Sequence, residues 1–297
     1  MKNMYFVIFL LAFILVFSIS IVQADNSCKK TCKIKINKKI GPIKNYVTYY
    51  GEDHINELKD FDLSIIDASR QNPADIGKLK NPICYLSIGE INTGDTDLAS
   101  LPEKCFLHNA DGTKSVNKGG ADWTSYHINT ICPQWQKLMK ERATKLLSNG
   151  CKGIFFDTVD TADKYIQSND QAAVQSMVGI IQNIRNNNPN AILIQNRGLN
   201  VIDKTHNLVN AVMWEAFATE GGNLRPGRDA WFDLKLAELK SYDNLAIISL
   251  DYGLNNENEA VRQSLDQGFL PYISPDTSLN KINSNKIAQC NHIIGSK

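Results

Sequence analysis

The sequence predicts an α/β protein whose main domain folds as a (β/α)8 TIM barrel. Eight short apolar segments recur along the chain at intervals that leave room for a helix between neighbouring segments. Within a segment apolar residues follow one another directly, as in Ile154-Phe155-Phe156, so both faces of each strand should be covered. A doubly wound open sheet is the alternative, but no Gly-x-Gly-x-x-Gly follows the first segment. The predicted strands are residues 46–50, 63–67, 83–88, 154–157, 192–195, 211–215, 246–251 and 269–273.

Helices are predicted between these strands from apolar residues at helical spacing. The segment 134–147 follows Pro133 and runs into Asn149-Gly150, a C-terminal stop. The segment 170–185 ends in a run of Asn residues followed by Pro189. Further helices are predicted at residues 228–241, 257–267 and, from a weaker pattern, 279–288.

The N-terminus carries the pattern of a secretory signal peptide. Lys2 precedes an apolar run over residues 5–22, and Ala24 ends a small-residue cleavage site. An uncleaved anchor is the alternative, because about 18 apolar residues can just span a bilayer. The polar residues 25–27 favour cleavage. We therefore predict a signal peptide at 1–24, an entry segment at 25–44 and the barrel at 45–297, secreted to the extracellular space and free of the membrane after cleavage.

The charge balance excludes some partners. The chain has 32 basic and 31 acidic residues and a net charge of +1, so no global field attracts nucleic acid or an acidic membrane. Removing 24 of the 297 residues leaves 273, enough for one large barrel. We expect a monomer with no nucleic-acid partner.

Seven cysteines in an exported chain permit disulfides and leave at least one cysteine over. Cys105 and Cys132 lie in one long loop region and could close it, whereas Cys28 or Cys32 could reach Cys290. None has zinc-type spacing with nearby histidines, and no His-x-x-x-His or Gly-x-Ser-x-Gly occurs. We expect no metal site, no cofactor and no serine-based hydrolysis.

One connection is unusually long. Residues 89–132 join the third strand to the next helix, far beyond the usual length. Its glycines and aromatic residues, among them Trp123 and Tyr126, suit one wall of a substrate groove. An ordered excursion without a role in binding is the alternative.

Acids and amides stand at or just after the ends of successive predicted strands. In a closed barrel these ends share one face, and barrel enzymes place their chemistry there. A carboxylate beside the packed interior is costly to desolvate, so several together indicate function. A single acid in such a place more often caps a helix or fixes a turn, and it is the repetition that supports a site. The residues are Asp67, Glu90, Asp157, Gln195, Asn196, Glu215 and Asp251.

Several runs resemble one enzyme family. The runs Cys84-Tyr-Leu-Ser-Ile-Gly-Glu90 and Gly150-Cys-Lys-Gly-Ile-Phe-Phe-Asp-Thr-Val-Asp160, with Glu215 at the sixth strand, are similar to glycoside hydrolase family 114, the endo-α-1,4-polygalactosaminidases. The resemblance covers nearly the whole mature chain. It implies a (β/α)8 barrel without a metal that cleaves an α-1,4-linked, galactosamine-rich polysaccharide. Ile91-Asn92-Thr93 departs from many relatives, which affects the substrate more than the chemistry.

The resemblance implies that Asp157 and Glu215 are the catalytic carboxylates and that Glu90 and Asp160 line the sugar site. Glycoside hydrolysis needs one protonated carboxyl and one ionised carboxylate. We expect Asp157 to be the ionised nucleophile. Glu215, between Trp214 and Phe217, should lie in apolar surroundings that keep it protonated as the acid/base. By analogy with other barrel α-glycosidases, the enzyme should retain configuration.

The remaining binding residues are predicted from their positions near the strand ends. A ring of acids should favour a cationic amino sugar over a uronic acid polymer. Aromatic rings should stack on sugars, and we favour Trp123 and Tyr252 over Trp214, which is better placed for packing. Amides can bond hydroxyls or close a turn. Beyond Glu90 and Asp160, the predicted substrate-binding residues are Asp67, Tyr49, Trp123, Asn196, Asp251 and Tyr252.

Two other functions compete with this one. A carbohydrate-binding barrel without turnover would bind polymer and release no oligosaccharide. A metal-dependent carbohydrate deacetylase would be inhibited by a chelator.

Overall fold

The computed structural model describes residues 34–36, 42–119 and 123–283, all within one compact unit, Cys32–Lys297. The predicted signal peptide, most of the entry segment and any pairing of Cys28, Cys32 and Cys290 lie outside the described residues. No helix in the described part is long and apolar enough to cross a membrane.

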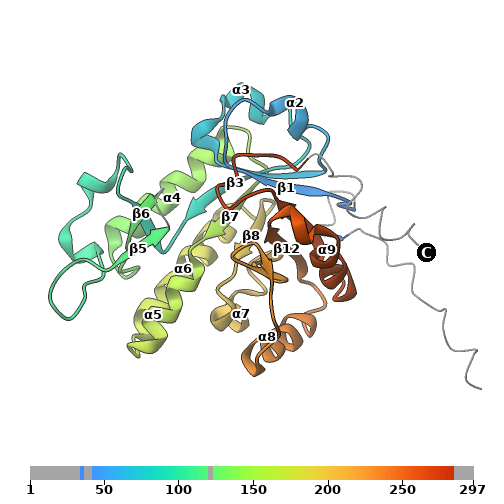
Figure 1. Ribbon diagram of the computed structural model, residues 1–297. Helices are drawn as coiled ribbons and strands as arrows, with labels where there is room; N and C mark the ends of the chain where they lie inside the picture. The colour runs from blue at the N-terminus through green and yellow to red at the C-terminus, as the bar shows by residue number, and fades with distance from the viewer. Residues whose placement is uncertain (1–33, 37–41, 120–122, 284–297) are drawn as a thin grey trace, which may run out of the picture. The chain divides into compact units, whose positions relative to one another are not determined.

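Eight parallel strands form the central sheet, in the order β1-β2-β3-β7-β8-β9-β12-β13. The two end strands β1 and β13 lie against each other, and Tyr46 on β1 donates a hydrogen bond across to the Ser249 carbonyl of β12. The sheet is thus a nearly closed barrel with helices around it, as predicted (Figure 1). The strands are β1 (Tyr46–Tyr49), β2 (Leu63–Ile66), β3 (Pro82–Ser87), β7 (Gly153–Asp157), β8 (Ile192–Asn196), β9 (Ala211–Glu215), β12 (Ala246–Tyr252) and β13 (Leu270–Ser274).

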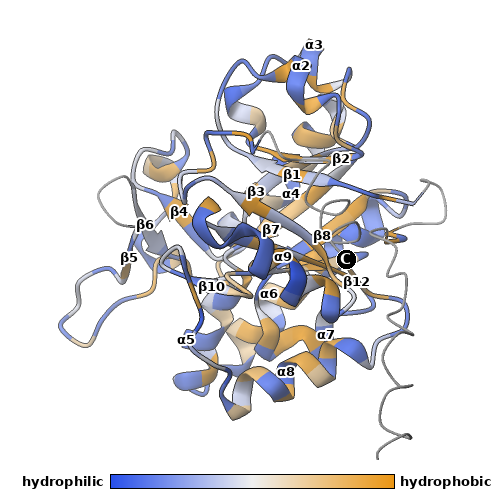
Figure 2. Ribbon diagram, turned by 45° about the vertical axis from the view of Figure 1, so that its right-hand side comes forward, coloured by the Kyte–Doolittle hydropathy of each residue, from blue (hydrophilic) through white to orange (hydrophobic). Residues whose placement is uncertain are grey.

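Alternate residues along these strands belong to two apolar clusters. Phe155, Ile194 and Met213 belong to the inner cluster, which fills the barrel and extends under the first helices. Their neighbours Phe156 and Trp214 belong to the outer cluster, which packs under the later helices. Figure 2 shows hydrophobic residues concentrated on the strands and mixed with polar residues along the helices. The continuous apolar runs in the sequence reflect these two buried faces.

The helices begin and end at the signals present in the sequence. Pro133 opens α4, and Asp170 caps α6 by accepting a hydrogen bond from the Ala173 amide. Four predicted helices are confirmed, but the one at 279–288 is wrong over its described part, because residues 279–283 form no helix. The helices are α2 (Ile55–Leu58), α3 (Pro73–Ile76), α4 (Pro133–Ser148), α5 (Ala162–Gln167), α6 (Gln171–Asn187), α7 (Ile202–Thr205), α8 (Ala230–Lys240) and α9 (Glu257–Asp266).

The long β3–α4 excursion, residues 89–132, folds into a small antiparallel sheet of its own. Its strands are β4 (Glu90–Asn92), β5 (Val116–Gly119) and β6 (Trp123–His127), with β6 in the centre. Figure 1 shows β5 and β6 projecting to one side of the barrel. The expected disulfide between Cys105 and Cys132 closes the excursion. A second antiparallel pair, β10 (Thr219–Glu220) and β11 (Asn223–Leu224), follows β9.

A second disulfide, Cys84–Cys151, was not predicted. It joins Cys84 on β3 to Cys151, which lies two residues before the start of β7, and both cysteines are buried. A link across 67 residues restricts the unfolded chain and contributes on the order of 4 kcal/mol in the chain-entropy model. Cys84 lies on β3 and Cys151 just before the neighbouring strand β7, far apart in sequence, so spacing alone gave no signal for the bond.

Candidate active site

Three neighbouring strands end in polar side chains that face the barrel interior. β7 ends at Asp157, β8 at Asn196 and β9 at Glu215. Side chains alternate along a strand, and Phe155 and Met213, two positions before the acids, belong to the inner cluster. The alternation of side chains therefore directs both carboxylates inward. They lie at the carboxyl ends of the strands, where barrel enzymes place their chemistry.

One amide joins the two acids. Asn196 Nδ2 donates to Asp157 Oδ1 and to Glu215 Oε2, each at 2.8 Å. The two carboxylate oxygens therefore lie at most 5.6 Å apart, which is twice that bond length. Two acids that are 58 positions apart in the sequence thus converge on one nitrogen.

Tyrosine hydroxyls complete the surroundings of both acids. Tyr252 Oη donates to Glu215 Oε1, and the Tyr85 hydroxyl is hydrogen-bonded to Asp157. Tyr50 packs edge-on against Tyr85, with ring centroids 5.1 Å apart. Burial, followed by the nearby carboxylates, raises the pKa of Tyr50, Tyr85 and Tyr252 well above 10. These hydroxyls stay protonated, and those of Tyr85 and Tyr252 donate hydrogen bonds to the two acids.

The residue after each of the three site residues has a left-handed backbone. Thr158 follows Asp157 with φ 60°, Arg197 follows Asn196 with φ 47° and Ala216 follows Glu215 with φ 56°. Residues other than glycine rarely adopt this conformation, and it costs on the order of 1 kcal/mol or more at each position. The chain bends sharply where each polar side chain is presented, which is typical of functional sites.

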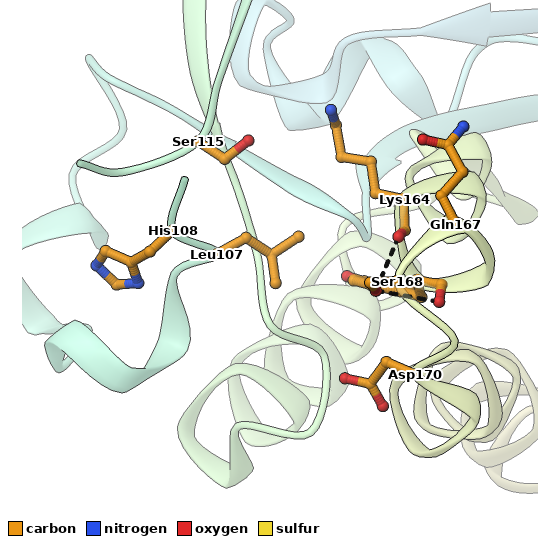
Figure 3. Close-up of a pocket in the computed structure, with 8 residues that line it drawn as sticks. Leu107, His108, Ser115, Lys164, Gln167, Ser168 and Asp170 are labelled. Carbon is orange, nitrogen blue, oxygen red and sulfur yellow. Dashed lines mark hydrogen bonds between the residues drawn. The ribbon is translucent and has the colours of Figure 1, made fainter. Parts of the chain in front are cut away.

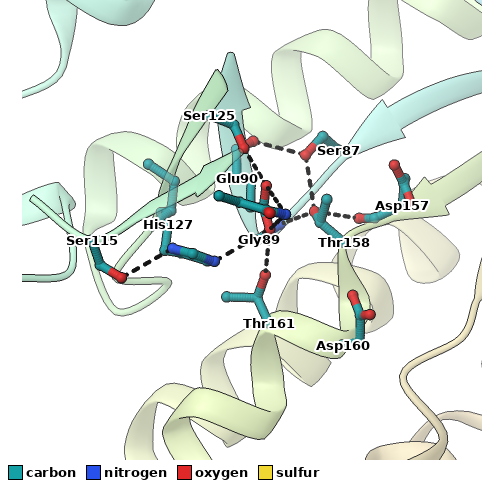
Figure 4. A network of polar contacts seen from close by, with 12 residues as sticks. Ser87, Gly89, Glu90, Ser115, Ser125, His127, Asp157, Thr158, Asp160 and Thr161 are labelled. Atoms are coloured by element: carbon teal, nitrogen blue, oxygen red, sulfur yellow. Dashed lines mark hydrogen bonds and ion pairs between the residues drawn. The ribbon is translucent and has the colours of Figure 1, made fainter. Parts of the chain in front are cut away.

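The end of β3 fixes the segment around Asp157. The Ile88 amide donates to the Asp157 carbonyl at 3.0 Å, and the Gly89 amide donates to Thr158 Oγ1 at 2.8 Å. A Cβ on Gly89 would lie 2.4 Å from the Thr158 carbonyl oxygen, so only glycine fits there. Figure 4 shows this contact between the two strand ends.

Glu90 anchors the excursion to the barrel. Its buried carboxylate accepts hydrogen bonds from Ser125, Asn117 and Thr161, and His127 Nε2 lies 3.5 Å from it (Figure 4). Burial raises the Glu90 pKa, and the three hydrogen bonds oppose that rise. Protein donors thus surround this predicted sugar-binding residue.

Asp160 lies one short turn beyond Asp157, in the 3-10 helix Val159–Thr161. Burial raises its pKa to about 6, and Arg197 acts in the opposite direction. The Arg197 guanidinium lies 3.4 Å from the Asp160 carboxylate. The carboxylate is close enough to Asp157 to interact electrostatically with it.

Asp251 is fully buried and supports the segment after Glu215. Its Oδ1 accepts hydrogen bonds from the amides of Ala218 and Thr219, both at 2.8 Å, and from the Thr219 hydroxyl. Burial raises its pKa from 3.8 to about 6, against these hydrogen bonds. Tyr252, the next residue, faces the acid pair, so Asp251 points to the other side of β12.

Because burial raises the pKa of Asp251, its contribution to the free energy of unfolding should fall as pH rises from about 4 to about 6. Below this window Asp251 is protonated in both states, and within it only the unfolded chain releases the proton. A rise from 3.8 to about 6 corresponds to about 3 kcal/mol. We predict that Asp251→Asn removes this part of the pH dependence, measured by urea unfolding between pH 4 and 7. Asp160 affects the wild type and the variant in the same direction. Identical slopes of unfolding free energy against pH in the two proteins would therefore contradict the prediction.

Three predicted binding residues have other contacts. Asp67 caps the short helix Ala68–Arg70 through the Ser69 amide. Tyr49 is buried behind β1, where its hydroxyl donates to the Glu52 carbonyl. Trp123 is 44% exposed on β6 of the excursion. The aromatic residues beside the acids are instead Tyr50 and Tyr85.

The prediction that Trp214 and Phe217 surround the Glu215 carboxylate is wrong. Trp214 faces away from the interior, and its ring packs against Phe217 and Phe232 of α8. The Glu215 carboxylate contacts Asn196 and Tyr252 instead. Strand alternation places Trp214 and Glu215 on opposite faces.

A pocket of about 380 Å³ lies between the excursion and α5 (Figure 3). Its lining includes Ser115 and His108 from the excursion and Lys164 from α5. None of the predicted site residues lines it, and it has no pair of facing carboxylates. Among the described residues, no group of three or more His, Cys, Asp or Glu is arranged to hold a metal ion.

Comparisons with known proteins agree with this architecture. An uncharacterized protein of Methanocaldococcus jannaschii, MJ1477, is 24% identical over 258 residues, which cover 75% of this chain and 73% of that protein. The glycoside hydrolase domain of PelA from Pseudomonas aeruginosa has a TM-score of 0.66 and 22% identity, covering 80% of this chain and 97% of that one. Ega3 from Aspergillus fumigatus, solved in complex with galactosamine, has a TM-score of 0.60 and 15% identity, covering 80% and 92%.

The family comparison covers almost the whole barrel. Residues 25–292 match the model of glycoside-hydrolase family GH114. The match includes the ends of β7 and β9 with Asp157 and Glu215. The chain therefore belongs to glycoside hydrolase family GH114.

Proposed function

We propose that this protein is a secreted, retaining endo-glycosidase that cleaves α-1,4-linked, galactosamine-rich polysaccharide. The observation that carries the proposal is the single amide shared by Asp157 and Glu215, which limits their bonded oxygens to 5.6 Å. Retaining glycosidases hold their two carboxyl groups about 5–5.5 Å apart, and inverting enzymes about 6.5–9.5 Å. The short separation favours direct attack by a carboxylate, because an inverting enzyme needs room for a water molecule.

The hydrogen bonds are compatible with Glu215 as the acid and Asp157 as the nucleophile. Glu215 Oε1 accepts a hydrogen bond from the Tyr252 hydroxyl, and this hydroxyl can turn and become the acceptor when Oε1 is protonated. Glu215 can therefore carry a proton on Oε1 and act as the acid. Asp157 and Glu215 share the same Asn196 amide, so the choice of Asp157 as the nucleophile follows the analogy with other barrel α-glycosidases.

The reaction then proceeds in two steps. Glu215 gives its proton to the glycosidic oxygen while Asp157 Oδ2, the oxygen not bonded to Asn196, attacks the anomeric carbon. The bond to the leaving sugar breaks and a glycosyl ester forms on Asp157. Glu215 next removes a proton from water, which attacks the same carbon and releases the product with its original configuration.

The preference for an amino sugar rests on charge. Asp157 and Asp160 provide anionic charge beside the reacting bond, which attracts a protonated amine and repels a uronic acid. The related barrel of Ega3 was solved with galactosamine. Secretion is supported by the signal-like N-terminus and by two disulfides, which are typical of oxidising compartments.

Product analysis tests the proposal. The purified protein would be incubated with partly deacetylated galactosaminogalactan, chitosan and polygalacturonan, and products followed by mass spectrometry. We expect oligosaccharides of several lengths from the first polymer and none from polygalacturonan. Activity should persist in the presence of a chelator. Binding of the polymer without release of oligosaccharide would identify a carbohydrate-binding barrel instead.

A further inference from the structure

We propose that Asn196 is the positioning residue that sets both the spacing and the protonation pattern of the acid pair. The inference rests on the proposed roles of Asp157 and Glu215. It reassigns Asn196, which the sequence suggested as a sugar-binding residue, because its amide nitrogen is already used by the two carboxylates.

Chemistry fixes the orientation of this amide. A side-chain amide nitrogen carries two hydrogens and can only donate, whereas its oxygen can only accept. Turning the amide over would place that oxygen against two carboxylates. With the nitrogen toward the acids, each hydrogen has one acceptor, and Oδ1 accepts no hydrogen bond from the described residues.

The backbone around Asn196 holds the amide in place. The residue is 6% exposed at the end of β8, between the strands that carry the two acids. Gln195, on the opposite face of the strand, donates to the carbonyls of Arg197 and Gly198. The Arg197 amide donates to the Met213 carbonyl of β9 at 2.9 Å. Asn196 is thus fixed relative to β9, which ends at Glu215.

The amide also controls where protons are held. Two close carboxyl groups ordinarily share one proton, as in aspartic proteases. An N–H donor between Asp157 Oδ1 and Glu215 Oε2 excludes a proton from both of these oxygens. The proton of the acid is therefore directed to Glu215 Oε1, where the Tyr252 hydroxyl changes from donor to acceptor. Both carboxylates lose a hydrogen-bond donor when the amide is removed, which disfavours their ionised forms.

The test combines kinetics with direct titration. We expect Asn196→Ala to lower kcat about 100-fold, because small misplacements of reacting groups have effects of this size. KM should stay within a few-fold of the wild-type value, and both limbs of the pH profile should move upward by about one pH unit. The near-isosteric Asn196→Asp adds a third acid that cannot donate when ionised, so its activity should survive best at low pH. Asn187→Ala, on the surface of α6, is the matched control.

Titration by ¹³C NMR of the Asp and Glu carboxyl groups provides a readout that is independent of any substrate. Asp157→Asn and Glu215→Gln variants assign the two signals, and circular dichroism checks the fold of each variant. The expected result is an upward shift of both titrations in Asn196→Ala. Unchanged titrations, or a higher KM with unchanged kcat, would overturn the inference. If the titrations shift but no polymer is cleaved, the proposed function fails and the positioning role stands.

Discussion

Replacing Asp157 with Asn is expected to lower kcat by about 10⁴-fold or more while leaving the fold intact. The amide has nearly the size of the carboxylate but cannot attack the anomeric carbon, so no glycosyl ester forms. The loss should appear in release of reducing ends from galactosaminogalactan under saturating conditions. Thermal unfolding should stay near that of the wild type, because Asp157 is half-buried at the end of β7.

Two further experiments test this role. Asp203→Asn, an exposed acid on α7, is the matched control and should keep full activity. In Asp157→Gly, added azide should restore turnover and give a glycosyl azide of inverted configuration, because azide then attacks from the side of the lost carboxylate. NMR of early wild-type products should show retained configuration. Asp157→Asn with more than a tenth of wild-type activity would remove this residue from the mechanism.

Replacing Glu215 with Gln should lower kcat by about 10²–10⁴-fold, the usual contribution of a general acid/base. Gln cannot give a proton to the leaving oxygen. The alkaline limb of the pH profile, which follows loss of that proton, should disappear in the variant.

A substrate with a good leaving group separates the two steps. An aryl galactosaminide needs little help from an acid, so the first step should recover in Glu215→Gln and the glycosyl ester should accumulate. Mass spectrometry of the intact protein would detect it. An unchanged alkaline limb, or equal losses for aryl and polymeric substrates, would show that another group is the acid. Tyr252, bonded to Glu215 Oε1, would be the next residue to test.

The sequence was sufficient to predict the barrel, because each strand is a short run that is apolar on both faces. Packing against helices outside and against other strands inside requires this composition. The boundaries agree within about two residues, and the caps at Pro133 and Asp170 explain where two of the helices begin. The weak pattern at 279–288 had no such signal at its start.

The site was only partly predictable, because runs buried on both faces hide which residues point inward. The acids themselves show which residues point inward. If Glu215 faces the interior, then Trp214, the residue before it, must face the helices. β1 ends without an acid, so the sequence could not show that Tyr50 rather than Tyr49 lies beside the site. The contact between Tyr85 and Asp157 depends on the register of β3 against β7, in which Ser87 pairs with Asp157.

The two disulfides are nested, which limits how far local unfolding can spread. Cys84–Cys151 joins the middle of β3 to the chain just before β7, and Cys105–Cys132 closes a smaller ring within that stretch. The chain between Cys84 and Cys151 therefore forms a ring that is closed by one disulfide beside the barrel. The outer bond keeps β3 and β7 joined even when the excursion unfolds, so opening of the excursion need not separate the strand that carries Asp157 from its neighbour.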